Sequence, residues 1–226
     1  AWYSEASAGC PTFIFLHGNG THIAQDKARY APMLEMGTGF LAVSWPGYAG
    51  SDGAPGEPAF RKAADASADW LLASGVEPAD IIIHGDSIGS GPATRLASER
   101  QFGALVLEEP YFSLRDLVGQ KVPFMPIGLI LKSTFRSDLW IGDVKTPLLI
   151  VHGDADTLIP QSQSRRLFEI ANEPKTYESL PGAQHSTLVE AGLYDRIWPF
   201  LAANWSPADG SVSCFTASSN SSETTL

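Results

Sequence analysis

Short apolar runs recur along this chain, separated by stretches with a helical pattern. The runs are rich in Ile, Val, Leu and Phe at successive rather than alternate positions, which is typical of strands covered on both faces. Five strong runs and a weaker sixth lie at residues 12–17, 40–45, 80–85, 104–109, 147–153 and 175–181. We predict a strand for each of them.

The stretches between these runs predict helices. The candidates lie at residues 23–36, 58–74, 88–100, 161–172 and 187–204. Pro58 and Pro160 stand where two of them begin, and proline is tolerated there because an N–H in the first turn has no partner to lose. The repeated alternation of strand and helix predicts an α/β fold, with a mostly parallel sheet and helices on both faces.

Two stretches interrupt the alternation. Residues 111–140 carry aromatic residues and prolines without a strand pattern, and the segment is too long for a plain loop, so we predict a small helical cap. Residues 206–226 are rich in Ser and Thr and offer little to bury, which predicts a disordered tail. Residues 1–205 are interpreted as a single domain.

Composition narrows the function without selecting one. With 226 residues, 44% of them hydrophobic and 18% charged, the chain suits a soluble globular domain with a substantial core. Its net charge of −10 repels phosphate backbones, so nucleic acid is excluded as a partner. No apolar run is long enough for a stable membrane span. Cys10 and Cys214 match no metal spacing and make no disulfide framework, so they do not indicate a compartment.

The chain begins at Ala1 rather than at a methionine. We interpret this as the loss of a preceding segment, which could have carried a leader or membrane anchor. Localisation and oligomeric state therefore stay open.

Candidate chemistry first emerges in GDSIGSG, at residues 85–91. Ser87 stands after an apolar run and before a helical pattern, with Gly85 and Gly89 two positions to either side. This is the nucleophile-elbow pattern G-x-S-x-G, in which a tight turn lifts the serine hydroxyl clear of the sheet and the glycines avoid collisions with the neighbouring strand and helix. A plain glycine-rich turn has the same pattern, so the interpretation needs partners for the serine.

A serine hydroxyl needs a base, and the base needs an acid that holds it in one tautomer. With this elbow the chain order is serine, acid, histidine. Among the five histidines, His185 lies in a glycine-containing loop after the last predicted strand, whereas His22 lies upstream of the serine. Three others end apolar runs, where an imidazole most often satisfies backbone groups: His17, His84 and His152. We therefore favour His185 as the base.

The acid is expected in DADTLIP, after the run at 147–153. This loop offers Asp154 and Asp156. Asp156 lies further into the loop and can swing toward the loop of His185, whereas Asp154 is closer to the strand end and can brace the turn, so Asp156 is favoured. Glu108 is an outside candidate, with a strand-end charge under the cap as its alternative role.

Acyl transfer also needs N–H donors for the oxyanion of the tetrahedral intermediate, each contributing about 3–4 kcal/mol. One donor is expected at Ile88, directly after the serine. The other is expected at Asn19 in HGNG, after the run at 12–17, because the glycines there let the backbone approach a substrate.

Together, the motifs HGNG, SWPGYAGSDG, GDSIGSG, EEPYFS, HGDADTLIP and GAQHS resemble those of the alpha/beta-hydrolase superfamily. The resemblance covers about residues 1 to 204 and is closest to small-capped serine hydrolases with an HGN-type oxyanion loop, among them esterases, lysophospholipase-like enzymes and acyl-protein thioesterase-like enzymes. It implies an alpha/beta-hydrolase fold with a short helical cap. It also implies these roles: nucleophile Ser87, acid Asp156, base His185, and backbone oxyanion donors Asn19 and Ile88.

Two features depart from the family's pattern. The segment before AWYSE normally supplies one or two antiparallel edge strands, so we expect those strands to be missing and the sheet edge to be exposed. Position 86 is Asp where His or Arg is common, and Asp86 either raises the affinity of the base for a proton or faces solvent.

The resemblance implies two-step acyl transfer from a small-molecule ester or thioester, acyl-chain substrates included. Neither a metal nor an organic cofactor is implied, since the sequence has no HExxH, CxxC pair or GxxxxGK[ST] loop. The alternatives are a catalytically inert binding or scaffold module and, on the same triad, an acyltransferase or a serine peptidase. Apolar side chains of the cap suit an acyl chain or pack within the cap itself: Phe112, Leu117, Val118, Phe124, Met125, Ile127, Leu129, Ile130, Leu131 and Phe135.

Overall fold

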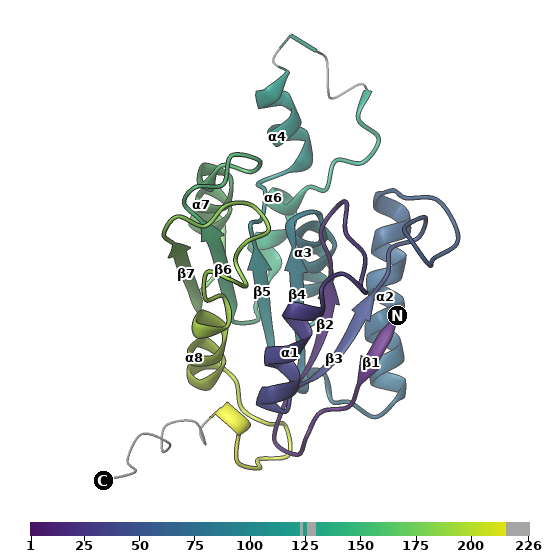
Figure 1. Ribbon diagram of the computed structural model, residues 1–226, viewed down its shortest axis with the longest axis vertical. Helices are drawn as coiled ribbons and strands as arrows, with labels where there is room; N and C mark the ends of the chain where they lie inside the picture. Colours follow the sequence, from purple (N-terminus) through teal and green to yellow (C-terminus); the bar gives the residue numbers. More distant parts are fainter. Residues whose placement is uncertain (123, 126–129, 216–226) are drawn as a thin grey trace.

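The computed structural model describes residues 1–122, 124–125 and 130–215, and its centre is a seven-stranded sheet (Figure 1). The strand order is β1-β3-β2-β4-β5-β6-β7, and every neighbouring pair is parallel except β1 and β3. The strands are β1 (Trp2–Ser4), β2 (Thr12–Leu16), β3 (Gly39–Val43), β4 (Ile81–Asp86), β5 (Ala104–Glu108), β6 (Leu148–Gly153) and β7 (Lys175–Leu180). All six predicted strands are present, so the predicted mostly parallel sheet is confirmed.

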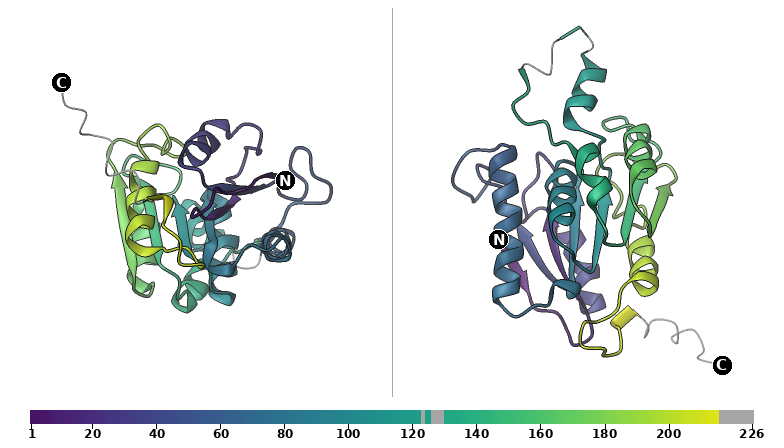
Figure 2. Two further views of the ribbon diagram at one scale, coloured as in Figure 1. Left: turned by 90° about the horizontal axis from the view of Figure 1, so that it is seen from below. Right: turned by 180° about the vertical axis from the view of Figure 1, so that it is seen from behind.

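Helices cover both faces of this sheet (Figures 1 and 2). They are α1 (Lys27–Met36), α2 (Glu57–Ala73), α3 (Ser90–Glu99), α4 (Leu114–Lys121), α6 (Ser137–Trp140), α7 (Gln161–Ile170) and α8 (Tyr194–Asn204), with short 3₁₀ turns at Pro78–Asp80, Ser87–Gly89 and Ile141–Asp143. The last helix begins later than the predicted residue 187, because turns occupy residues 188–192 and Gly192 has a φ of 90°. Among the described residues, no helix combines the length and apolarity needed to cross a bilayer.

The apolar strands divide their side chains between two cores. Ile14 and Leu16 of β2 belong to the core under α2, α3 and α7, whereas Phe13 and Phe15 belong to the core under α1 and α8. Successive side chains of a strand point to opposite faces. A strand with helices on both sides is therefore apolar at every position, which accounts for the uninterrupted runs in the sequence.

The expectation that the N-terminal edge strands are missing is wrong for one strand. β1 pairs antiparallel with β3, with Trp2 opposite Ala42 and Ser4 opposite Phe40. This strand is short and mostly exposed, so it lacks the apolar run by which the other strands were found. It covers the edge of β3 that would otherwise be open.

Within the segment predicted to form a cap, residues 111–140, α4 lies above the carboxyl ends of the strands (Figure 1). Leu117 and Phe135 are buried in the core of the domain, so these members of its apolar set serve packing. Phe124 is fully exposed. Two members of the set, Ile127 and Leu129, lie outside the described residues.

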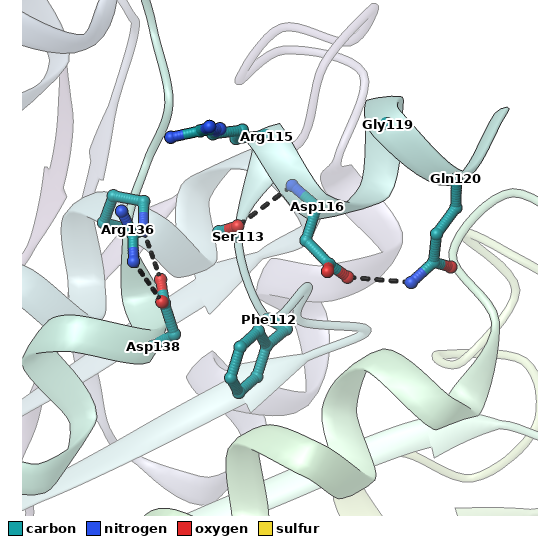
Figure 3. Close-up of a pocket in the computed structure, with 8 residues that line it drawn as sticks. All are labelled: Phe112, Ser113, Arg115, Asp116, Gly119, Gln120, Arg136 and Asp138. Atoms are coloured by element: carbon teal, nitrogen blue, oxygen red, sulfur yellow. Dashed lines mark hydrogen bonds and ion pairs between the residues drawn. The ribbon is translucent and has the colours of Figure 1, made fainter. Parts of the chain in front are cut away.

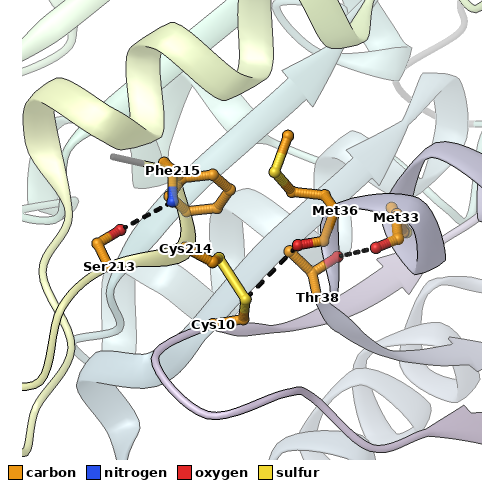
Figure 4. Close-up of a disulfide and its surroundings, with 7 residues drawn as sticks. All are labelled: Cys10, Met33, Met36, Thr38, Ser213, Cys214 and Phe215. Atoms are coloured by element: carbon orange, nitrogen blue, oxygen red, sulfur yellow. Dashed lines mark hydrogen bonds between the residues drawn. A yellow bond between two sulfur atoms is a disulfide. The ribbon is translucent and has the colours of Figure 1, made fainter. Parts of the chain in front are cut away.

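The disordered tail predicted for 206–226 is wrong for its first part. Residues 206–215 are described, and Phe215 is buried against Trp198 and Trp205. Cys214 forms a disulfide with Cys10, although the sequence pattern indicated no disulfide framework (Figure 4). The two cysteines meet because this segment returns along the lower end of the sheet, which their distance in the sequence does not reveal.

Candidate active site

Ser87 lies at the tight turn between β4 and α3, and its φ is 50°. The two flanking glycines are needed for this turn. A Cβ on Gly89 would lie 1.9 Å from Leu16 O, and one on Gly85 would lie 2.6 Å from the Cβ of Ala93. Both distances are far below van der Waals contact, so the neighbouring strand and helix exclude larger residues at these positions.

The structure brings Ser87, His185 and Asp156 together in a line. Ser87 Oγ lies 3.1 Å from His185 Nε2, and His185 Nδ1 lies 2.8 Å from Asp156 Oδ2. When Nδ1 donates its proton to Asp156, Nε2 has a lone pair for the hydroxyl proton of Ser87. Asp156 and Ser87 are buried, and His185 is partly exposed.

The loop after β6 fixes the orientation of Asp156. Its Oδ1 accepts the N–H groups of Leu158 and Ile159 at 2.8 and 2.9 Å, which leaves Oδ2 for His185. Burial alone would raise the pKa of Asp156, but hydrogen bonds from His152, His185 and the backbone outweigh it and hold the pKa far below its ordinary value. Asp156 is therefore ionised at neutral pH.

Asp154, the other candidate in this loop, lies elsewhere. Its Oδ1 accepts the N–H of Gly182 at 2.7 Å and so ties the Asp156 loop to the His185 loop. This is the bracing role that was considered for it.

The protonation of His185 is set by its acidic surroundings. Burial lowers its pKa, but the hydrogen bond to Asp156 and the charges of Glu109 and Asp86 raise it, with a net effect above 6.5. Asp86 does not face solvent. It is 5% exposed with a carboxylate 3.8 Å from Arg29, and burial raises its pKa well above 3.8.

The two expected oxyanion donors lie on loops that flank the serine. Ile88 follows Ser87 directly, and a Cβ on Gly18 would lie 3.5 Å from the Cβ of Ser87, so the loop that carries Asn19 runs beside the serine. Tyr48 donates a hydrogen bond to the Asn19 side chain, which anchors this loop. Glycine at position 18 permits the close approach.

Sequence reasoning missed one residue of the site, Glu109. Its Oε2 lies 3.0 Å from His185 Nδ1 and accepts the N–H of Ser186 at 2.9 Å. Glu108, the outside candidate, bonds to Arg29 and His84 instead and does not contact His185. The available signal was the pair of glutamates in EEPYFS, of which the sequence analysis considered only Glu108.

Glu109, Asp156 and His185 form the one group of acidic, His or Cys side chains in the described part of the chain whose ligand atoms all lie within 4.8 Å of one another. These atoms could ligate a cation. The same geometry puts both carboxyls on Nδ1 of the imidazole, where they accept its proton.

Two of the strand-end histidines bind backbone groups as expected. His17 Nδ1 lies 2.8 Å from Gly18 O, and His152 Nε2 lies 2.8 Å from Ile159 O. His84 is different, because its partner is the carboxylate of Glu108.

A pocket of about 540 Å³ is lined by residues of the segment 111–140, and Ser87 is not among its lining residues (Figure 3). Its lining residues are Phe112, Ser113, Arg115, Asp116, Gly119, Gln120, Arg136 and Asp138. Arg136 bonds to Asp138 at 2.6 Å, and Asp116 accepts from Gln120 at 2.8 Å (Figure 3). Arg136 and Asp138 therefore neutralise each other, whereas the ion pair of Asp116 is with Arg166 outside the lining.

Comparison with known proteins gives one family match and several relatives. Residues 140–192 match the family described as "Serine aminopeptidase, S33". An uncharacterized protein of Mycobacterium tuberculosis is 31% identical over 188 residues, which cover 82% of this chain and 67% of that protein. Alpha/beta hydrolase domain-containing protein 17B of Xenopus laevis is 30% identical over 207 residues, which cover 85% of this chain and 68% of that protein. The chain spans about two thirds of the length of these relatives.

Solved structures share the fold at lower sequence identity. Est1E from Butyrivibrio proteoclasticus, solved with ferulic acid bound, matches with a TM-score of 0.73 and 18% identity, over 90% of this chain and 94% of that one. This likeness concerns the arrangement of the sheet and its helices.

Proposed function

This chain belongs to the alpha/beta-hydrolase superfamily, and we propose that it is a serine hydrolase that cleaves carboxylic ester or thioester bonds through an acyl-enzyme. One observation carries the proposal: Ser87 Oγ lies 3.1 Å from an imidazole whose other nitrogen is bonded to the ionised Asp156. A serine with an oriented base is an activated nucleophile, and acyl transfer is the chemistry that such a nucleophile performs.

In the first step Ser87 Oγ attacks the carbonyl carbon of the substrate, and its proton passes to His185 Nε2. The carbonyl oxygen becomes an oxyanion, which the N–H groups of Asn19 and Ile88 bind. The carbon–oxygen or carbon–sulfur bond to the leaving group then breaks. His185 returns its proton to the departing alkoxide or thiolate, and Ser87 is left acylated.

In the second step a water molecule takes the place of the leaving group. His185 accepts a proton from the water as its oxygen attacks the acyl carbon, and the proton returns to Ser87 when the ester bond to the enzyme breaks. Asp156 keeps Nδ1 protonated and stabilises the imidazolium in both steps. The products are the carboxylic acid and free enzyme.

Amide cleavage is a second candidate, favoured by the match of residues 140–192 to a family described as a serine aminopeptidase. The same triad would expel an amine in place of an alcohol or thiol. Comparison of p-nitrophenyl esters with aminoacyl p-nitroanilides separates the two activities, because ester hydrolysis alone would leave the anilides intact.

The proposal is tested by labelling with a fluorescent fluorophosphonate, which reacts with activated serines. We expect labelling of the wild-type protein and none of Ser87→Ala, together with a loss of esterase activity on the order of 10⁴-fold or more in that variant. A series of p-nitrophenyl esters of increasing chain length then measures the acyl preference.

An unlabelled wild-type protein that hydrolyses none of these esters would reject the proposal and favour an inert binding module. Ser90→Ala is a matched control, because Ser90 is a buried serine at the start of α3 whose hydroxyl bonds to Ser87 O and contacts no imidazole. It should still be labelled.

A further inference from the structure

His185 meets two carboxyl groups at its Nδ1 atom rather than one. Asp156 Oδ2 lies 2.8 Å from this nitrogen and Glu109 Oε2 lies 3.0 Å from it. They come from different parts of the fold, Asp156 from the loop after β6 and Glu109 from the turn after β5. A triad requires one acid at this nitrogen, so the proposed acyl-transfer reaction does not require Glu109.

Glu109 is held firmly in this position. It is 1% exposed, its Oε2 accepts the N–H of Ser186 at 2.9 Å, and its own N–H donates to Val151 O at 2.9 Å. Its φ of 48° lies in a region that residues other than glycine rarely adopt, and such residues concentrate at functional sites. Its Oε1 is buried with no hydrogen-bond partner among the described residues. Both the positive φ and the unpaired Oε1 cost stability, and a residue with only a structural role would be more stable without them.

We propose that Glu109 is a second positioning residue for His185, which shares the Nδ1 proton with Asp156 and orients the imidazole alone when Asp156 is removed. This inference rests on the proposed function, because the orientation of His185 matters to the reaction only if His185 is the base for Ser87. Glu109 forms no bond to substrate and acts through the imidazole.

The charges around the imidazole explain how two carboxyls share one nitrogen. Three acids face it from the ends of three strands: Asp156, Glu109 and Asp86. Asp156 is ionised because its hydrogen bonds outweigh its burial, whereas burial raises the pKa of Glu109 to about 8 and the charge of His185 opposes that rise. The negative charge of Asp156 adds to that rise. Its removal would therefore lower the pKa of Glu109, and the charge of a protonated His185 lowers it further, which favours a carboxylate beside the imidazolium.

The test compares Asp156→Ala, Glu109→Gln and the double variant, with kcat/KM for p-nitrophenyl acetate and the rate of fluorophosphonate labelling as readouts. We expect Asp156→Ala to lose about 10- to 100-fold, less than the roughly 10⁴-fold expected of a triad with a single acid. Glu109→Gln should lose less than about ten-fold. In the double variant kcat/KM should be about 100-fold lower than in Asp156→Ala. The two substitutions are not independent, because each acid orients His185 when the other is absent.

The pH profile separates positioning from simple packing. In Asp156→Ala the Glu109 carboxylate should keep the pKa of His185 raised. In the double variant that carboxylate is gone, so the acidic limb of kcat/KM should move to lower pH. Asp69→Asn is the control, since Asp69 bonds to Arg100 on the surface, away from the loops of the site. Its profile should follow that of the wild type.

Equal activities and equal pH profiles for Asp156→Ala and the double variant would overturn this inference, while Ser87-dependent labelling of the wild type would leave the proposed function standing. Without that labelling both fail. If Asp156→Ala does not fold, Asp156→Asn replaces it in both backgrounds, because its amide oxygen can still accept the N–H groups of Leu158 and Ile159. Circular dichroism of each variant confirms folding.

Discussion

Glu108 and Glu109 are consecutive residues at the end of β5, and each is 1% exposed, yet their surroundings differ in charge. Glu108 follows Val106 on the face of the sheet that α1 covers, where it bonds to Arg29 and to His84. Glu109 lies in the turn after the strand and faces His185, with no arginine or lysine among its contacts in the described part of the chain.

Their ionisation differs accordingly. Burial would raise the pKa of Glu108, but Arg29 and His84 outweigh it, so the pKa lies well below its ordinary value. For Glu109 burial is the largest effect and raises the pKa to about 8. Two carboxyls of equal exposure thus have pKa values shifted in opposite directions, and the difference is the presence of a cation beside Glu108.

The largest effect should come from breaking the buried ion pair. Arg29→Met leaves the Glu108 carboxylate without its cation and should lower the free energy of unfolding by about 3–5 kcal/mol. Urea denaturation at pH 7 measures this change. Arg100→Met is the control, because it breaks an exposed pair with Asp69 and should cost less than about 1 kcal/mol. Equal losses of unfolding free energy in the two variants would show that the buried ion pair stabilises the fold no more than the exposed one.

The pH dependence of stability should distinguish the two glutamates. Glu109 has a folded pKa of about 8 against an ordinary value of 4.5, so it binds more protons in the folded state and its contribution is lost as the pH rises from about 4.5 to about 8. Glu108 behaves in the opposite way, since its lowered pKa gives a contribution that is lost as the pH falls below about 4.5.

Glu109→Gln should remove the first of these contributions and leave the second. Between pH 5 and pH 8 the wild type should therefore lose more stability than the variant, by at most about 4 kcal/mol. Urea denaturation of both proteins across this range makes the comparison. Parallel curves would show that Glu109 does not release a proton in this window.

The smallest effect should come from Asp86, which stands between the two environments: its carboxylate is 3.8 Å from Arg29, and its charge raises the pKa of His185. Asp86→Asn should lower that pKa and move the acidic limb of kcat/KM for p-nitrophenyl acetate to lower pH, by less than about one unit. Asp69→Asn should leave the limb in place, since Asp69 bonds to Arg100 on the surface. A shift to higher pH in Asp86→Asn would contradict the assignment.

The expected triad was accessible from the sequence because its signals are local. Each signal lies within a window of about ten residues: the glycines around Ser87, the strand before DADTLIP, and the loop before the last helix. The order of these motifs along the chain then predicts which residue is the acid and which is the base. The same holds for the six strands with uninterrupted apolar runs.

The position of Glu109 beside His185 could not be predicted from the local sequence. Strand periodicity predicts which face of the sheet Glu108 lies on. Glu109 has a positive φ, so its side chain leaves the strand pattern and contacts Ser186, which lies in a loop 77 positions later in the chain. No local pattern encodes that meeting. The three residues of β1 likewise carry too few apolar positions to be recognised, and their pairing depends on β3 already being in place.

The disulfide between Cys10 and Cys214 joins positions 204 residues apart, so almost the whole domain is a closed covalent ring. A single backbone cut in the exposed stretch at residues 52–55 would open the ring but release no fragment, and two pieces would separate only after reduction. In a closed ring the chain ends can be moved to another position. New ends placed at 52–55, with residues 10 and 214 connected through a peptide linker in place of the sulfur bridge, would preserve the pairings among β2 to β7 and omit β1, which lies outside the ring.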